Sequence, residues 1–189
     1  MNTEFAYQSD YERYEMINGE IYMMSSPSTN HTRINGNLHS LFKNYLRGKR
    51  CEPFDNLNLF LDDENAYIPD EMIVCDPDIV EEDGIHGVPD LVAEILSKST
   101  ADIDRNEKFA KYEKYGVKEY WIVDQYMRRV EVYHLVNGKF EKKISAQYYT
   151  DREFKLLTEN QKAAVVSEIK VSLYDDFVVQ VEDIFERVK

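Results

Sequence analysis

Hydrophobic and polar positions along the chain follow two periods, one typical of strands and one typical of helices. Twice, an Asn-Gly pair separates two strand-like segments, and this dipeptide is the one best suited to a type I′ turn. The pairs are Asn18-Gly19 and Asn137-Gly138, and each predicts a β-hairpin. The hairpin strands are expected over residues 13–17 and 20–24, and over residues 129–136 and 139–144.

Apolar residues at helical spacing predict an amphipathic helix over residues 31–46. Thr29 or Asn30 is expected to cap the start of this helix. Arg47-Gly48 then supplies a basic last turn and a stop signal.

A second helix is expected to begin at Asp104, because Asp104 and Glu107 form a capping-box pattern. This helix is expected to run to Tyr115 and to end at Gly116. A third helix is expected near the C-terminus, over residues 178–188.

The remaining apolar segments read as strands. They are residues 56–61, 67–75, 89–96, 119–124 and about 169–173. The order is therefore a hairpin, a helix, three strands, a helix and then more strands. This order predicts an α/β fold of the α+β kind, in which a mixed sheet is flanked by helices. No repeat or linker interrupts the chain, so residues 1–189 are expected to form a single domain with its core at about 56–124.

Composition supports a folded core but is unusual for a nucleic-acid binder. Of the 189 residues, 43% are hydrophobic, and 14 Tyr and 9 Phe are among them, which is enough to build a sizeable core. The formal net charge is −13, whereas proteins that bind nucleic acid usually carry a basic surplus for phosphate contacts. Tight, non-specific binding to nucleic acid is therefore less expected, unless a metal neutralises some carboxylates.

The sequence predicts a cytoplasmic protein. No stretch reaches the roughly 18 apolar residues that a membrane span needs. Residues 1–10 are polar and carry Glu4 and Asp10, so they lack the basic and then apolar order of a signal peptide. Only two cysteines are present, Cys51 and Cys75, and without an export signal both are expected to be reduced thiols.

Two acidic residues stand in strand segments that otherwise read as buried. Asp70 shares a strand face with Met72, and Glu94 shares one with Val92 and Leu96. An unpaired buried carboxylate costs at least several kcal/mol, so each must be protonated, paired with a cation or bound to a metal. Divalent cations such as magnesium or manganese prefer oxygen ligands of this kind. The alternative for either acid is a salt bridge or an exposed strand end.

Lys108 adds a third candidate. It precedes Tyr112 by four residues and Tyr115 by seven, so the three share one helix face. In one interpretation, its stem simply covers apolar surface, as lysine side chains often do. In the functional interpretation, its ammonium points back at the carboxylate pair, where it orients an attacking water and offsets developing charge.

These residues resemble the PD-(D/E)XK nuclease superfamily. Pro69-Asp70 matches the leading pair of its motif, and Glu94-Ile95-Leu96 occupies the position of acid-x-lysine. Within the superfamily, the chain is similar to a bacterial restriction endonuclease-like family of the Uma type, a domain of unknown function. The segments that carry this similarity are Tyr14–Glu20, Gly87–Val92, Glu94–Ser97, Asp104-Arg105, Lys108, Tyr112, Gly116-Val117 and Glu119–Asp124.

The resemblance implies a restriction endonuclease-like core with a magnesium or manganese ion. Asp70, Glu94 and the backbone carbonyl of Ile95 would be its ligands. Leu96 stands where the superfamily places a lysine, so the resemblance assigns that role to Lys108 from the following helix. Lys98 is a rival donor in the intervening loop.

Other polar residues are weaker candidates. Glu20 and His31 are candidates to support the site, although a hairpin glutamate and a histidine at a helix start are often ordinary surface residues. Asp90 is interpreted as structural. Candidates for phosphate contacts are Arg105, Lys111, Lys114 and Lys118. The histidines His39, His86 and His134 are scattered and predict no cluster of metal ligands.

The sequence thus favours a metal-dependent endonuclease that hydrolyses phosphodiester bonds in nucleic acid, with DNA as the expected polymer. One alternative is a nucleic-acid-binding module that keeps the nuclease fold but has little or no activity. Another is an acidic protein-interaction domain. The expected partners are nucleic acid and a second copy of the chain, since double-strand cutters often pair two sites, and no membrane is expected.

Overall fold

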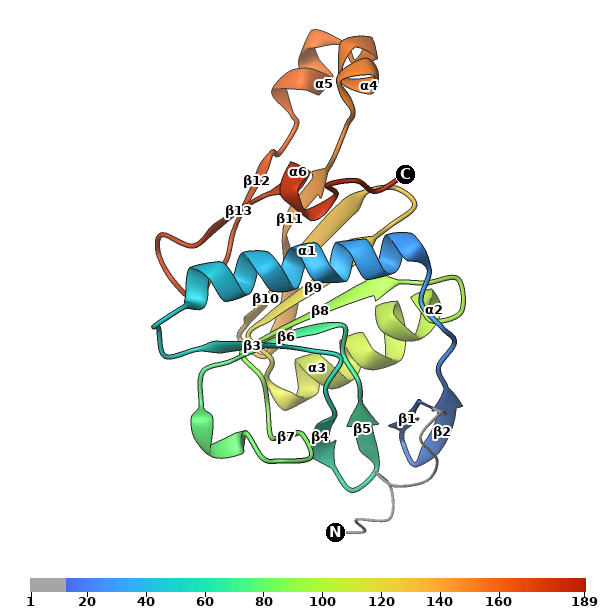
Figure 1. Cartoon of the computed structure of the whole chain (residues 1–189), viewed down its shortest axis with the longest axis vertical. Coiled ribbons are helices and arrows are strands. Elements are labelled where there is room, and N and C mark those ends of the chain that lie inside the picture. The colour runs from blue at the N-terminus through green and yellow to red at the C-terminus, as the bar shows by residue number, and fades with distance from the viewer. Residues whose placement is uncertain (1–12) are drawn as a thin grey trace.

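The computed structural model describes residues 13–189 (Figure 1). The interpretation of residues 1–10 as lacking a signal peptide therefore lies outside the described residues. Among the described residues, no helix is long and apolar enough to cross a membrane.

A mixed sheet of six strands forms the centre of the fold. Its spatial order is β11-β10-β9-β8-β6-β3. The strands are β3 (Glu52–Asp55), β6 (Glu71–Val74), β8 (Leu91–Leu96), β9 (Glu119–Asp124), β10 (Arg129–Val136) and β11 (Lys139–Gln147). Only β8 and β9 pair in parallel, and the other neighbours are antiparallel. The expected mixed sheet is confirmed.

Helices cover both faces of this sheet. Helix α1 (Thr29–Leu46) lies across one face and buries Ile34, Leu38 and Phe42 against it (Figure 1). On the opposite face, α3 (Phe109–Tyr115) contributes the buried Tyr112. Strand β8 is central, because its alternate side chains enter these two separate cores.

A smaller sheet of five short strands carries the first hairpin. Its order is β2-β1-β5-β4-β7. The strands are β1 (Tyr14–Ile17), β2 (Glu20–Met23), β4 (Leu59–Asp62), β5 (Asn65–Tyr67) and β7 (Ile85–His86). Asn18 and Gly19 both have positive φ, 54° and 78°, as a type I′ turn requires. Both predicted hairpins are confirmed.

The remaining elements are short. They are the 3₁₀ turn η2 (Pro77–Ile79), α2 (Ala101–Ile103), the π-helical segment η3 (Asp104–Lys108), α4 (Asp151–Leu156), α5 (Glu159–Ala163), β12 (Glu168–Lys170), β13 (Val178–Gln180) and α6 (Val181–Ile184). The pair α4 and α5, which the sequence did not predict, projects beyond β11 and β12, away from both sheets (Figure 1).

Several predicted boundaries are wrong, among them the start of the strand predicted over 56–61, which begins at Leu59. Ser28, rather than Thr29 or Asn30, caps α1, and its Oγ accepts the His31 N–H at 3.1 Å. The second helical segment begins at Ala101, three residues before the predicted start. At the C-terminus, β13 and the short α6 replace the helix expected over 178–188.

The predicted strand over 67–75 is two strands in two different sheets. Strand β5 ends at Tyr67 in the small sheet, and β6 begins at Glu71 in the large one. Pro69, which has no N–H to donate to a ladder, lies in the break between them. Asp70 therefore stands at the junction of the two sheets and not inside a strand.

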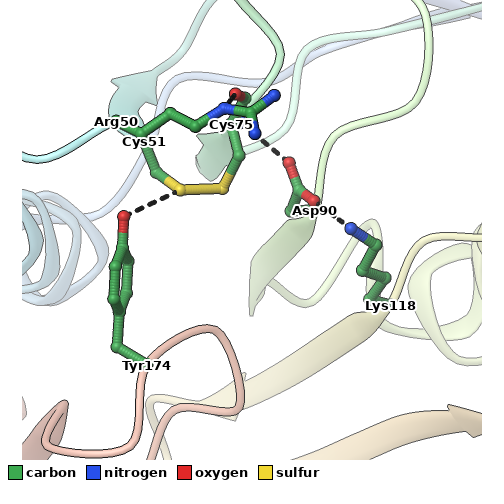
Figure 2. The surroundings of a disulfide bond; sticks show 6 residues. All are labelled: Arg50, Cys51, Cys75, Asp90, Lys118 and Tyr174. Carbon is green, nitrogen blue, oxygen red and sulfur yellow. Dashed lines mark hydrogen bonds and ion pairs between the residues drawn. A yellow bond between two sulfur atoms is a disulfide. The ribbon is translucent and has the colours of Figure 1, made fainter.

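The expectation of two reduced cysteines is also wrong, because Cys51 and Cys75 form a disulfide (Figure 2). The antiparallel pairing of β3 with β6 places Glu52 opposite Val74, so the next residues outward, the two cysteines, face each other. Tyr174 Oη donates a hydrogen bond to Cys51 Sγ at 3.2 Å. The sequence did not predict β3, so it gave no reason to bring the cysteines together.

Candidate active site

Asp70 and Glu94 lie side by side, and backbone bonds link them. Asp70 Oδ2 accepts the N–H of Ile95 at 2.8 Å, and Glu94 Oε2 accepts the N–H of Asp70 at 3.4 Å. Both side chains are buried, since Asp70 is 8% exposed and Glu94 only 3%. Each carboxylate thus bonds to the backbone of the segment that carries the other, which holds the two acids together.

The ammonium of Lys108 sits among three carboxylates. Lys108 Nζ lies 2.8 Å from Glu15 Oε1, 3.1 Å from Glu94 Oε1 and 3.4 Å from Asp104 Oδ1. Burial lowers the pKa of Lys108, but the charges of Glu15, Glu94 and Asp104 outweigh burial and raise that pKa well above its usual value. Lys108 is therefore a fully charged, buried cation that touches one of the two predicted metal ligands.

Glu15 and Asp104 were not predicted as site residues. Glu15 lies on β1, where it shares the buried side of the strand with Ile17, so the argument applied to Asp70 and Glu94 also applies to it. Asp104 was interpreted as a helix cap. In the structure it lies four residues before Lys108 within a helical segment and is 2% exposed.

Tyr112 and His31 complete the site. The hydroxyl of Tyr112 donates to Glu94 Oε1 at 2.8 Å. His31 Nε2 lies 3.2 Å from Asp70 Oδ2. Burial lowers the pKa of His31, but the hydrogen bond and charge of Asp70 and a hydrogen bond to the backbone of Ile95 give a net rise.

The site holds more buried negative charge than its own cations neutralise. The four acids are Glu15, Asp70, Glu94 and Asp104, and the two basic groups are Lys108 and His31. Even with His31 protonated, two negative charges remain when all four acids are ionised. Burial raises the pKa of both Glu94 and Asp104, so protons relieve part of this excess. A divalent cation would relieve it in another way, and the oxygen donors of the acids suit a hard ion.

One atom of the site lacks a hydrogen bond. Among the described residues, Asp104 Oδ1 is buried without a hydrogen-bond partner, although it lies 3.4 Å from the Lys108 ammonium. Unsatisfied buried polar atoms are rare, and they often mark the place of an ion or water. The donor set and this atom together fit a site that takes up a cation.

Two predicted candidates lie outside this cluster. Glu20 is exposed, and its carboxylate accepts the Tyr22 hydroxyl at 3.2 Å. Lys98 is exposed in the turn that follows β8. In the part of the chain that the structure describes, neither forms a hydrogen bond or ion pair with Asp70, Glu94 or Lys108, so Lys108 is the lysine that reaches the acids.

The four basic residues proposed for phosphate contacts do not lie on one helix face. Lys118 follows the end of α3 at Gly116 and pairs with Asp90 at 2.6 Å. Arg105 pairs with Glu131 at 2.5 Å. Lys111 and Lys114 remain on α3. Part of the basic charge expected for phosphate contacts is thus already paired within the protein.

Asp90 has a structural role. It accepts the N–H of Cys75 at 2.7 Å and the ammonium of Lys118, and the guanidinium of Arg50 also points toward it (Figure 2). These contacts tie the start of β8 to the disulfide.

His39, His86 and His134 were expected to form no cluster of metal ligands, and for His86 this expectation is wrong. Ligand atoms of Glu81, Asp83 and His86 lie within 4.8 Å of one another. The two acids are exposed, and the Asp83 carboxylate already contacts His86 Nε2 at 2.9 Å. All three lie within residues 81–86, where the chain turns back on itself between the bridged residues Val80 and Ile85.

Known proteins resemble this chain in sequence. Uncharacterized protein sll1609 from Synechocystis sp. is 32% identical over 133 residues, which cover 68% of this chain and 75% of that protein. Uncharacterized protein slr1290 from the same organism is 34% identical over 127 residues, which cover 65% of this chain and 66% of that protein.

A solved structure resembles the fold. The crystal structure of a putative nuclease belonging to DUF820 from Anabaena variabilis superimposes with a TM-score of 0.68 at 19% identity, and the match covers 91% of this chain and 89% of that one. This likeness confirms the restriction endonuclease-like α/β fold. The family model of Uma2, described as a putative restriction endonuclease, matches residues 3–160. The chain therefore belongs to the Uma2 family of putative restriction endonucleases.

Proposed function

We propose that this protein is a metal-dependent endonuclease that hydrolyses phosphodiester bonds in nucleic acid, with DNA as its substrate. Family membership supports the nuclease class. The observation that carries the metal dependence is the buried excess of carboxylates around Asp70 and Glu94, beside the ammonium of Lys108.

The carboxylates of Asp70 and Glu94 and the backbone carbonyl of Ile95 would hold a magnesium or manganese ion. Their oxygen donors match the preference of these ions. When bound, such an ion lowers the pKa of an attacking water and polarises the scissile phosphate. Among the described residues, the Asp70 carboxylate contacts the Ile95 N–H and His31 through Oδ2, which leaves Oδ1 for a ligand.

The protein's own groups would prepare the reaction. The Lys108 ammonium is fixed beside Glu94, where it offsets negative charge that develops on the phosphate. The Tyr112 hydroxyl and the backbone N–H of Asp70 bond to different oxygens of Glu94 and fix the plane of its carboxylate. The superfamily motif places a lysine where this chain has Leu96. Lys108 would supply that ammonium from the following helix.

A cleavage assay tests this proposal. Supercoiled, linear and branched DNA are incubated with the protein in magnesium or manganese. Linear RNA is tested in parallel under the same conditions. Asp70→Asn, Glu94→Gln and Lys108→Met should each lower the cleavage rate by at least about 10²-fold, the range measured when a preorganised electrostatic group is removed. Matched controls are Glu64→Gln and Lys139→Met, both at exposed positions away from the site.

Calorimetry with manganese gives a second measurement. Asp70→Asn and Glu94→Gln should weaken metal binding, whereas Glu64→Gln should not. Cleavage that survives both substitutions would remove Asp70 and Glu94 from the mechanism. Salt-dependent DNA binding without turnover in either metal would favour the alternative, a binding module that keeps the nuclease fold. The homodimer stays a prediction. Light scattering of the free and the DNA-bound protein would measure the molar mass and so test it.

A further inference from the structure

We propose that Glu15 is a positioning residue of the active site, because a single oxygen, Oε1, holds both the Lys108 ammonium and the backbone segment that carries Asp70. The inference rests on the function proposed above and extends it to the N-terminal hairpin. It concerns where the ammonium sits relative to the metal ligands, and it assigns Glu15 no contact with substrate.

Two short, buried hydrogen bonds meet at this oxygen. Glu15 Oε1 accepts Lys108 Nζ at 2.8 Å and the backbone N–H of Ile68 at 3.0 Å. Ile68 lies two residues before Asp70, in the break between the two sheets. Glu15 is 4% exposed, so water does not replace either bond easily. The ammonium and the metal-ligand segment are therefore fixed to a common point.

Without Glu15, Lys108 has a competing partner on its own helical segment. Asp104 lies four residues earlier, 3.4 Å from the ammonium, and its Oδ1 has no hydrogen bond among the described residues. Glu15 at 2.8 Å is the closest of the three acids to Lys108 Nζ. We infer that Glu15 draws the ammonium away from Asp104 and keeps it beside Glu94. The π-helical turn that joins Asp104 to Lys108 agrees with this role, since such turns are frequent at functional sites.

The hairpin is held firmly enough to position a side chain. The N–H of Asn18 donates to Asn65 Oδ1 at 3.1 Å, and the N–H of Gly19 donates to the Glu64 carbonyl at 2.9 Å. Strand β1 also pairs with β5 through Met16 and Ala66. The turn and one strand of the hairpin are thus bonded to the segment that precedes Asp70.

Two substitutions at Glu15 separate the effect of side-chain length from the effect of charge. Glu15→Asp keeps the charge but shortens the side chain by one methylene, so its carboxylate falls short of both donors. Glu15→Gln keeps the length and one acceptor oxygen but removes the charge. If position matters, Glu15→Asp should lower kcat by up to about 10²-fold, the effect expected of a displacement of about 1 Å at an active site. Glu15→Gln should lose less, and KM should stay near its wild-type value in both. Glu64→Gln, at the exposed turn that binds the hairpin, is the matched control.

A second readout does not need nuclease activity. Acetylation of lysines, followed by mass spectrometry of the folded proteins, reports how accessible the Lys108 ammonium is. In the wild type and in Glu15→Gln, Lys108 should be protected, as its 2% exposure indicates, whereas in Glu15→Asp it should react faster. The exposed Lys139 is the internal standard and should react equally in all variants.

These two readouts distinguish the two proposals. If the wild type cleaves no nucleic acid, the proposed function fails, and acetylation alone decides the placement of Lys108. A kcat of Glu15→Asp equal to that of the wild type would overturn the role of Glu15, as would a larger loss in Glu15→Gln than in Glu15→Asp. Unchanged protection of Lys108 in Glu15→Asp would overturn it as well.

Discussion

Replacing Lys108 by Met removes the one lysine from a buried cluster of acids and tests the electrostatic account of the site directly. Methionine preserves most of the apolar volume of the side chain, so packing changes little. The substitution leaves Glu15, Glu94 and Asp104 with no ammonium between them, and each of these acids is at most 4% exposed.

The expected loss of stability follows from burial. Removing one partner of a buried ion pair typically costs about 3–5 kcal/mol, because the remaining charge is left without compensation. Lys139 is the matched comparison, since it pairs with Glu113 at 2.7 Å but its side chain is 78% exposed. Solvent screens such a surface pair, so Lys139→Met should cost less than about 1 kcal/mol.

Urea unfolding at pH 5 and pH 7.5 provides the measurement. Burial raises the pKa of Glu94 and Asp104, and the Lys108 charge opposes this rise. Once the lysine is gone, the folded state binds more protons than the unfolded state over a wider pH range. Stability of Lys108→Met should therefore fall as pH rises above the ordinary carboxyl pKa. At pH 5, the acids take up protons and the loss relative to wild type should shrink.

The reasoning is refuted if Lys108→Met loses no more stability than Lys139→Met at pH 7.5. A large loss that is the same at both pH values would also contradict it, because that loss would reflect packing and not charge.

Three further predictions concern other parts of the fold. Reduction of the Cys51–Cys75 bridge, whose cysteines are 24 residues apart, should lower the free energy of unfolding by about 3 kcal/mol, measured by urea unfolding with and without a thiol reductant; no change would mean that the bridge does not form. Burial raises the pKa of Glu71 from 4.5 to about 8, so this group should make the protein less stable as pH rises through that window; Glu71→Gln should remove that part of the pH dependence, and an identical profile would contradict the shift. Gly116 has φ +92° at the end of α3, so Gly116→Ala should cost about 1 kcal/mol of stability, seen as a lower Tm, and an unchanged Tm would argue against the left-handed cap.

Local patterns predicted elements well where local chemistry decides them. The two Asn-Gly turns and the strand Glu119–Asp124 are confirmed, because turn geometry and apolar runs are properties of short segments. The strand predicted over 67–75 failed, since both halves are buried and the apolar run hides the change of sheet. Pro69 was the available signal.

Contacts between distant segments explain the other errors. Strand β3 reads Glu-Pro-Phe-Asp, which has neither alternation nor an apolar run, so its pairing with β6 and the resulting disulfide were invisible in the sequence. Asp104 matched a local capping pattern, but its burial beside Lys108 depends on Glu15 and Glu94, which come from other elements.

The candidate site was predicted in part. Asp70, Glu94 and Lys108 stood out as charged residues in apolar surroundings, and the structure brings them together. Glu15 carries the same signal on β1, but it was not singled out as a candidate site residue.

The first hairpin also sets the smallest fragment worth making. A polypeptide that begins after Met23 would still contain Asp70, Glu94 and Lys108 and all six strands of the large sheet. It would nevertheless lack the carboxylate that joins Lys108 to Ile68. An inactive product of such a truncation would say nothing about the catalytic competence of the intact protein, so N-terminal boundaries for expression should lie ahead of Tyr14.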